Sequence, residues 1–295
     1  MIDIRSPEMI AYIRALRPMP ARVGFVSARV WAVVFRTLAA GYHRRGAREV
    51  ARASRPGPSA ILAVPRTREE AREAYDTLSK FYDYTTGALG RRYTRLGLTS
   101  LSIAEGETVL EIGFGTGRSL QLMADRVGAG GKAYGLDLSA GMIRVAAGRL
   151  RRAGLAGRVG LCCGDALHLP FREGVFDAVF MSFVLEVLDT PEIPEVLVQV
   201  KKALKPGGRL GVTSMSKEKG ETVLIRLYEW AHGKWPKYLG SRPIYAHQCL
   251  VDAGYLIRTW QKIRIFRLPA EIVVAVRPGP GGAVQAGGRR PVGHS

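Results

Sequence analysis

The alternation of short apolar segments with helical patterns, which begins near Glu105, limits the fold of this chain more than any other feature. Such alternation is typical of strand-helix-strand units, whose strands pair in parallel within one sheet. The sequence therefore predicts an α/β domain with a doubly wound, mostly parallel sheet. The first five strands are expected at residues 108–112, 132–136, 159–163, 178–181 and 209–215.

The last two expected strands, residues 256–268 and 271–276, are joined by only a few residues around Pro269. A parallel crossover needs about a dozen residues or more, so these strands should form an antiparallel hairpin. The prediction is thus a seven-stranded sheet whose C-terminal hairpin distinguishes it from an all-parallel dinucleotide-binding fold.

Capping residues and apolar periodicity place the helices between these strands. Ser139 is a natural N-cap for a helix, and Pro194 suits the first turn of another helix that ends before Pro206-Gly207-Gly208. Further helices are expected at residues 119–127, 223–232 and 246–253.

A glycine-rich turn follows the first expected strand, with Gly113, Gly115 and Gly117 in alternate positions. Glycine allows positive φ and close approach of a ligand to the backbone, and the following helix presents free N–H groups. Arg118 stands where a dinucleotide fingerprint would place its third glycine, which disfavours NAD.

Two carboxylates follow the next strands of the expected sheet. Asp137 ends the second strand and can accept hydrogen bonds from both ribose hydroxyls, while Asp165 follows the third strand. Open α/β sheets bind ligands at the carboxyl ends of their strands. Together with the glycine turn, these residues predict one nucleoside-sized crevice.

Composition divides the chain into three zones, a leader (1–68), a patterned domain (69–277) and a Gly/Pro-rich tail (278–295) expected to be disordered. The leader holds thirteen arginines against three acidic residues, so more than half of the net charge of +19 lies outside the domain. We expect the leader to contain basic amphipathic helices or to be disordered. A spanning helix is not expected, because Arg29 and Arg36 interrupt its most apolar stretch.

The three cysteines, Cys162, Cys163 and Cys249, have no metal-type spacing. Their pattern favours a reducing, cytoplasmic compartment and argues against a metal site or a disulfide framework.

Five segments of the domain resemble the motifs of class I S-adenosylmethionine-dependent methyltransferases, which have a Rossmann-like sheet. They are residues 111–117, 136–142, 164–171, 176–179 and 204–208. The pattern is most similar to the ubiquinone/menaquinone-biosynthesis C-methyltransferases and the related phospholipid N-methyltransferases. Residues 74–76 and 81–83 also resemble the short segment that closes over the cofactor in those enzymes.

The resemblance implies S-adenosyl-L-methionine as the cofactor and a role for each matching residue. Glu111 would orient the glycine turn and the methionine end, with Gly113, Gly115 and Gly117 beneath the cofactor. Asp137 would bind the ribose, and Leu138 and Met142 would flank the adenine. Asp165 would accept a hydrogen bond from the adenine amino group, and the Ala166 N–H would donate to the ring. Tyr82, Ser182 and Phe183 would lie near the cofactor, the last two close to its methyl group.

The methyl acceptor is expected to be a small, lipophilic molecule, either quinone precursor-like or a lipid. Transfer to carbon also requires a base that removes a proton. His168 and Glu186 are the main candidates for this base, and His232 and His247 are two further candidates. The alternatives are a turn position for His168 and a solvated helix position for Glu186. Aromatic residues 228–238 could line a lid, or could equally be ordinary core.

Other functions remain open at this level. The basic leader could contact anionic lipids, giving a peripheral membrane location, although general arginine richness or a misassigned start would leave it without function. An RNA-modifying methyltransferase is disfavoured, since the domain has twenty-nine basic against twenty-two acidic residues and no nucleic-acid partner is expected. A catalytically silent nucleotide-binding regulator is the third possibility. The sequence does not indicate the oligomeric state.

Overall fold

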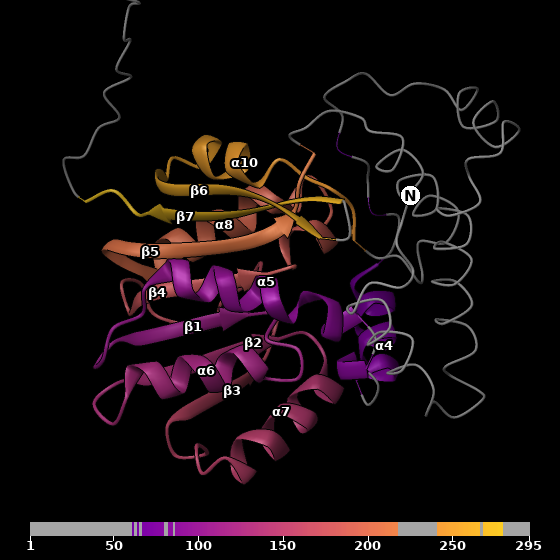
Figure 1. Cartoon of the computed structure of the whole chain (residues 1–295), viewed down its shortest axis with the longest axis vertical. Helices are drawn as coiled ribbons and strands as arrows, with labels where there is room; N and C mark the ends of the chain where they lie inside the picture. The colour runs from indigo at the N-terminus through magenta and orange to yellow at the C-terminus, as the bar shows by residue number, and fades with distance from the viewer. Residues whose placement is uncertain are drawn as a thin grey trace, which may run out of the picture.

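The computed structural model describes residues 61, 64, 67–79, 82–84, 86–217, 241–265 and 268–279. Within these residues the chain forms one seven-stranded sheet with the order β3-β2-β1-β4-β5-β7-β6 (Figure 1). The strands are β1 (Thr108–Ile112), β2 (Lys132–Asp137), β3 (Val159–Cys163), β4 (Phe176–Ser182), β5 (Leu204–Met215), β6 (Leu256–Ile265) and β7 (Leu268–Val276).

The strands from β1 to β5 pair in parallel, whereas β7 runs antiparallel to both β5 and β6. This arrangement confirms the predicted doubly wound sheet with its C-terminal hairpin. Because β1 pairs with both β2 and β4, the turn that follows β1 lies between the carboxyl ends of those two strands.

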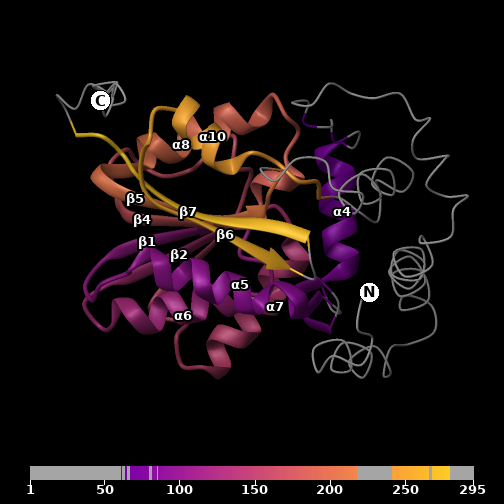
Figure 2. The same ribbon diagram turned by 45° about the horizontal axis from the view of Figure 1, so that its top comes forward.

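Helices cover both faces of the sheet, as Figure 2 shows. They are α4 (Arg68–Leu78), α5 (Thr86–Leu101), α6 (Arg118–Val127), α7 (Ala140–Arg152), α8 (Glu192–Ala203) and α10 (Ala246–Asp252), with 3₁₀ turns η1 (Tyr82–Tyr84) and η2 (Leu185–Val187). Successive strand residues point to opposite faces, so Val179 packs in the core beside α8 and α10 while Phe180 packs in the core beside α5, α6 and α7.

The last hairpin differs from the prediction at its turn. Strand β6 ends at Ile265 and β7 begins at Leu268, so Pro269 lies inside β7, opposite Arg264, and not in the connection. Proline is tolerated there because it lies next to the start of the strand, and its carbonyl still accepts a hydrogen bond from Ser216 N–H.

The start of β5 was also predicted too late. The Pro206-Gly207-Gly208 segment does not separate helix from strand, because Leu204 already pairs with Phe176 of β4. A register shift between Phe176 and Ala178 accommodates the extra residues. Such bulges depend on tertiary pairing and have no period that a sequence pattern would show.

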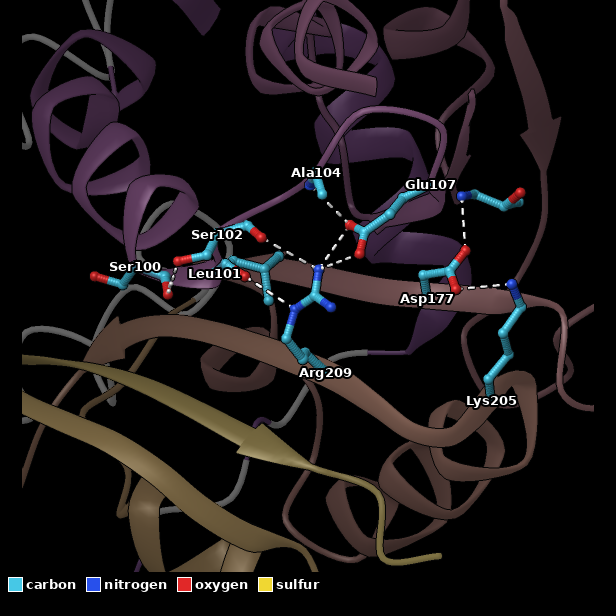
Figure 3. Close-up of polar contacts among 9 residues, drawn as sticks. Ser100, Leu101, Ser102, Ala104, Glu107, Asp177, Lys205 and Arg209 are labelled. Carbon is cyan, nitrogen blue, oxygen red and sulfur yellow. Dashed lines mark hydrogen bonds and ion pairs between the residues drawn. The ribbon is translucent and has the colours of Figure 1, made fainter. Parts of the chain in front are cut away.

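Charged side chains tie the elements together at the amino ends of the strands (Figure 3). Arg209 donates to both carboxylate oxygens of Glu107, at 2.6 and 2.9 Å, and its Nε donates to the Leu101 carbonyl at the end of α5. Asp177 accepts from Lys205 Nζ at 2.7 Å and from Thr108 N–H at 2.9 Å. These charges are satisfied within the fold, which leaves the carboxyl ends of the strands as the edge available for a ligand.

The predicted helices at 119–127 and 246–253, the helix after Ser139 and the helix with Pro194 in its first turn are confirmed within one or two residues. The leader helices, the tail, the helix at 223–232, the aromatic residues 228–238 and His232 fall almost entirely outside the described residues. Among the described residues, no helix is long and apolar enough to cross a membrane.

Candidate active site

The turn after β1 contains three glycines in backbone conformations that would be strained for any residue with a Cβ. Gly113, Gly115 and Gly117 have φ values of 67°, 56° and 76°. A Cβ on Gly113 would lie 2.5 Å from Val184 Cγ2, and one on Gly117 would lie 2.8 Å from Ala146 Cβ. At Gly115 the nearest atom would be Tyr82 Cε1 at 3.7 Å. Internal packing therefore requires Gly113 and Gly117, while Gly115 presents its backbone toward Tyr82.

Asp137 lies directly against this turn. Its two oxygens accept hydrogen bonds from Gly115 N–H at 2.8 Å and Ser139 N–H at 2.9 Å, and the residue is 9% exposed. Burial raises the pKa of Asp137 to about 6, although the hydrogen bonds from Ser139 and Gly115 act in the opposite direction. A carboxylate fixed at the carboxyl end of β2 is thus in place beside the turn, as the sequence predicts.

Glu111 is a buried carboxyl group of the site, and only one of its two oxygens has a hydrogen-bond partner among the described residues. The residue is 1% exposed; its Oε1 accepts a hydrogen bond from the Ser119 hydroxyl, and its Oε2 has no partner among the described residues. Burial and, to a smaller extent, the nearby Asp137 carboxylate raise the pKa of Glu111 to about 8, although the Ser119 hydrogen bond acts in the opposite direction. Buried acceptors are nearly always paired, so Oε2 is suited to a positively charged donor from a ligand.

Asp165 joins the same edge through the backbone of β2 and β3. Gly164 N–H donates to the Asp137 carbonyl at 3.0 Å, just as Gly113 N–H donates to the Leu136 carbonyl at 2.7 Å. Oδ1 of Asp165 accepts from Leu167 N–H at 3.0 Å and also forms an ion pair with Arg68. The ends of β1, β2 and β3 therefore form one continuous rim.

The residues expected to flank an adenine lie on this rim as well. Leu138 is half-buried, Met142 is 1% exposed, and Ala166 is buried between Asp165 and Leu167. The Ser139 side chain caps α7 by accepting from Met142 N–H at 3.0 Å, which confirms the predicted N-cap and fixes the start of the helix.

A segment that we call the strap, residues 67–79 and 82–84, crosses this edge; it contains α4, which Figure 2 shows standing across the end of the sheet. Asp76 accepts from the Ser139 hydroxyl and from Gly141 N–H at 2.8 Å, at the start of α7. Asp83 accepts from the Thr116 hydroxyl at 2.7 Å and forms ion pairs with Arg118 and Arg149. The strap is thus bound to the loops that follow β1 and β2.

Comparison with known proteins agrees with this geometry. The profile of a family described as methyltransferase domain matches residues 109–208. The ubiquinone/menaquinone biosynthesis C-methyltransferase UbiE of Cellvibrio japonicus is 32% identical over 172 residues, covering 57% of this chain and 68% of that protein. The chain belongs to the class I S-adenosylmethionine-dependent methyltransferases. S-adenosylmethionine is therefore the methyltransferase's cofactor.

One further relative resembles this chain in sequence, and two solved structures share its fold. The demethylmenaquinone methyltransferase of Lactiplantibacillus plantarum is 29% identical over 178 residues, covering 59% of this chain and 73% of that protein. The [4+2]-cyclase SpnF superposes with a TM-score of 0.60 at 21% identity, covering 75% of this chain and 100% of that chain. Geranyl diphosphate C-methyltransferase of Streptomyces coelicolor A3(2) gives 0.54 at 15% identity, covering 75% and 89%. At these identities the two structures show the fold alone.

Ser182 and Phe183, which were expected near the methyl group of the cofactor, lie at the carboxyl end of β4. Phe183 has a positive φ of 57°, and its N–H donates to the Thr213 carbonyl at 2.7 Å. Its ring would lie 3.2 Å from a Cβ on Gly90, so α5 packs against this turn. The Ser182 hydroxyl forms a 2.8 Å hydrogen bond with Thr94 of α5. The strained turn at Phe183 holds that residue at the carboxyl edge.

The two candidate bases of the methyltransferase have opposite environments. His168 is exposed in the turn after Asp165, where its backbone N–H donates a hydrogen bond to the Asp165 carbonyl at 3.0 Å. Glu186 is 1% exposed, and its Oε2 accepts from Met215 N–H at 3.2 Å. Burial raises the pKa of Glu186 well above its usual range, despite the Met215 hydrogen bond and the nearby Arg242 charge. The alternative reading of Glu186, a solvated helix position, is wrong, since η2 turns this side chain into the core.

His247 lies away from the glycine turn, on α10. Its ring stacks on Trp260 of β6 with a centroid distance of 3.9 Å and an interplanar angle of 18°. This position gives it a packing role on the outer hairpin.

Several residues of the site were not found by the sequence analysis, chiefly the polar contacts of the strap. Arg68 forms an ion pair with Asp165, and Arg118 and Arg149 form ion pairs with Asp83. Glu192 forms an ion pair with Arg68. One local signal was available: Thr67 and Glu70 form a capping box, a pattern that predicts the start of α4. The partners themselves are distant in sequence and carried no local signal.

Proposed function

We propose that this methyltransferase transfers the methyl group of S-adenosylmethionine to a small lipophilic acceptor of the quinone-precursor or lipid type. The observation that carries the cofactor site is the contact of Asp137 with the Gly115 N–H beside the unpartnered Glu111 Oε2. The acceptor class is supported by relatives named for quinone methylation, among them the 2-phytyl-1,4-naphtoquinone methyltransferase of Synechococcus elongatus.

The residues present fit the cofactor's functional groups. The orphaned Glu111 oxygen suits the ammonium of the methionine end, while the Asp137 carboxylate suits the ribose hydroxyls. Gly113, Gly115 and Gly117 provide the backbone surface beneath. Leu138 and Met142 would flank the adenine, with Asp165 and the Ala166 N–H at its polar edge.

Bound S-adenosylmethionine supplies an electrophilic methyl group on a sulfonium. The protein's contribution is alignment and exclusion of water. Tyr82, which lies next to Gly115, and Phe183, which follows β4, are the candidate side chains for this role. An acceptor carbon or hydroxyl must also lose a proton. Glu186 is the better placed candidate because it lies only three residues beyond Phe183, whereas His168 lies at the Asp165 end of the crevice.

Methyl transfer can be tested with the full-length protein and radiolabelled cofactor, offered to separated quinone, lipid and RNA fractions of a cell extract. We expect label in the quinone or lipid fraction with the wild type and none with Asp137→Ala. Glu107→Gln, at the opposite edge of the sheet, is the matched control and should retain transfer.

The other outcomes decide against the proposal in defined ways. Label confined to RNA, lost when residues 1–60 are removed, would favour an RNA-modifying enzyme. Cofactor binding without label in any fraction would favour a silent nucleotide-binding regulator.

We also propose that the arginine-rich leader holds the enzyme against anionic lipid, where a lipophilic acceptor would be dissolved. The support is its composition, thirteen arginines in the first 68 residues. Each such residue near a charged surface contributes about 1 kcal/mol. Sedimentation with anionic but not with zwitterionic vesicles is the expected result, and equal sedimentation with both would reject the idea.

A further inference from the structure

The first residue of α4 connects two acidic residues from different loops of the carboxyl edge. Arg68 forms an ion pair through Nη1 with Asp165 Oδ1 and through Nη2 with Glu192 Oε1 at 2.9 Å. Asp165 follows β3, and Glu192 begins α8. The three side chains are between 24% and 33% exposed, so the bridge is partly shielded from water.

The position of Arg68 is fixed by contacts on both sides of it. In the capping box of α4, Thr67 Oγ1 accepts from Glu70 N–H at 3.2 Å and Thr67 N–H donates to Glu70 Oε2 at 2.8 Å. Earlier in the chain, Val64 N–H donates to Asp189 Oδ1 at 3.0 Å. The guanidinium therefore projects from a helix start that is anchored to the loop before α8.

The contacts of Asp165 use only one of its carboxylate oxygens. Oδ1 accepts from Leu167 N–H and contacts Arg68, whereas Oδ2 has no hydrogen bond or ion pair from the described residues. Two contacts on one oxygen hold the plane of the carboxylate and leave the second oxygen to accept a donor. We infer that Arg68 is a positioning residue that orients Asp165 to accept the 6-amino group of adenine, and so gives the cofactor site its preference for adenine.

This inference rests on the proposed contact between Asp165 and the adenine. A purine with a carbonyl at position 6 would present a second acceptor to Asp165 Oδ2. The carbonyl oxygen and Oδ2 would then both lack a donor. Sites built to pair a polar group reject analogues that lack it. The discrimination depends on a fixed carboxylate, because a mobile one could turn away toward water.

The test compares two ligands that differ only at this position, S-adenosylhomocysteine and S-inosylhomocysteine, by calorimetric titration of the full-length protein. Arg68→Gln should lower the affinity for S-adenosylhomocysteine roughly five- to tenfold, the scale of one partly shielded charged contact. The affinity for S-inosylhomocysteine should stay unchanged. The affinity of Arg68→Lys for S-adenosylhomocysteine should lie between those of the wild type and Arg68→Gln, since a single ammonium replaces the planar guanidinium poorly.

Arg72→Gln is the matched control, because Arg72 lies one turn further along α4 and contacts only the exposed Glu69. It should alter neither affinity. Equal weakening of both ligands by Arg68→Gln would show a general effect of the strap and overturn the inference, as would no weakening at all.

Asp165→Ala separates the inference from the proposal beneath it. If Arg68 acts through Asp165, Arg68→Gln should cause no further loss in the Asp165→Ala background. If Asp165→Ala itself leaves the adenosyl affinity unchanged, the adenine contact fails. If only Asp165→Ala weakens binding, the contact stands and the role of Arg68 is rejected.

Discussion

Asp83 provides the strongest test of how the strap is held, because three donors converge on one carboxylate. The Thr116 hydroxyl lies 2.7 Å away, Arg149 Nη2 2.5 Å and Arg118 Nη2 2.8 Å, and the side chain is 15% exposed. Burial by itself would raise the pKa of Asp83, but the hydrogen bonds from Arg118, Thr116 and Arg149 lower it to about 2.

The magnitude of the effect follows from this pKa. Moving from 3.8 in the unfolded chain to about 2 in the folded protein corresponds to about 2 kcal/mol of stability. Because the folded pKa is the lower one, this stability is fully present above pH 3.8 and disappears as the pH falls through 2. At pH 3 about half of it should remain.

Urea unfolding of the wild type and Asp83→Asn between pH 7 and pH 3 measures this contribution. We expect the variant to be less stable by about 2 kcal/mol at pH 7 and by roughly half of that at pH 3. Asp125→Asn, which removes an exposed acid from α6, is the control and should unfold like the wild type. A difference that does not change with pH, or the absence of a difference, would refute an ionic attachment of the strap.

Three further predictions concern the site itself. Because burial raises the pKa of Asp137 to about 6, cofactor affinity measured by calorimetry should fall by up to about tenfold per pH unit below 6, and Asp137→Asn should abolish this dependence. Glu186→Gln should stabilise the protein in thermal melts, more at pH 8 than at pH 5. The reason is that burial raises the pKa of Glu186, so the buried carboxyl destabilises the fold as the pH rises. A difference in melting temperature that is the same at both pH values would contradict this. If Glu186 also takes the acceptor proton, the same variant should lose methyl transfer while retaining cofactor affinity. Gly113→Ala should cost about 1–3 kcal/mol in urea unfolding, since a Cβ would meet Val184 at 2.5 Å, whereas Gly154→Ala, at a similar positive φ in open space, should cost less.

Much of the fold could be predicted because its signals are local. The strands at 108–112 and 159–163 were located to the residue, and Ser139 caps α7 as its residue type predicts. The hairpin direction followed from the shortness of its connection. The turn at Pro269 was misplaced, since its strand register depends on pairing with Arg264 and not on the local pattern.

The meeting of the glycine turn and the acidic strand ends at one edge was also foreseeable, because parallel strands end at the same edge of a sheet. That topology brings Asp137 against Gly115, only 22 residues away in the chain. The environment of Glu186 was not foreseeable in this way. Its burial depends on η2 turning inward against the end of β5, where Met215 N–H donates a hydrogen bond to the Glu186 carboxylate.

The succession of strands along the chain, the glycine turn and the acidic strand ends were determined by the sequence alone, because each is set by residues next to one another in the chain. Only the tertiary structure decided how the strap is attached. Asp83 meets Arg149 across 66 residues, and Arg68 reaches Asp165 from a helix that precedes the sheet. An ion pair of this kind has no period or local spacing, so it exists only after the sheet has brought its loops to one edge.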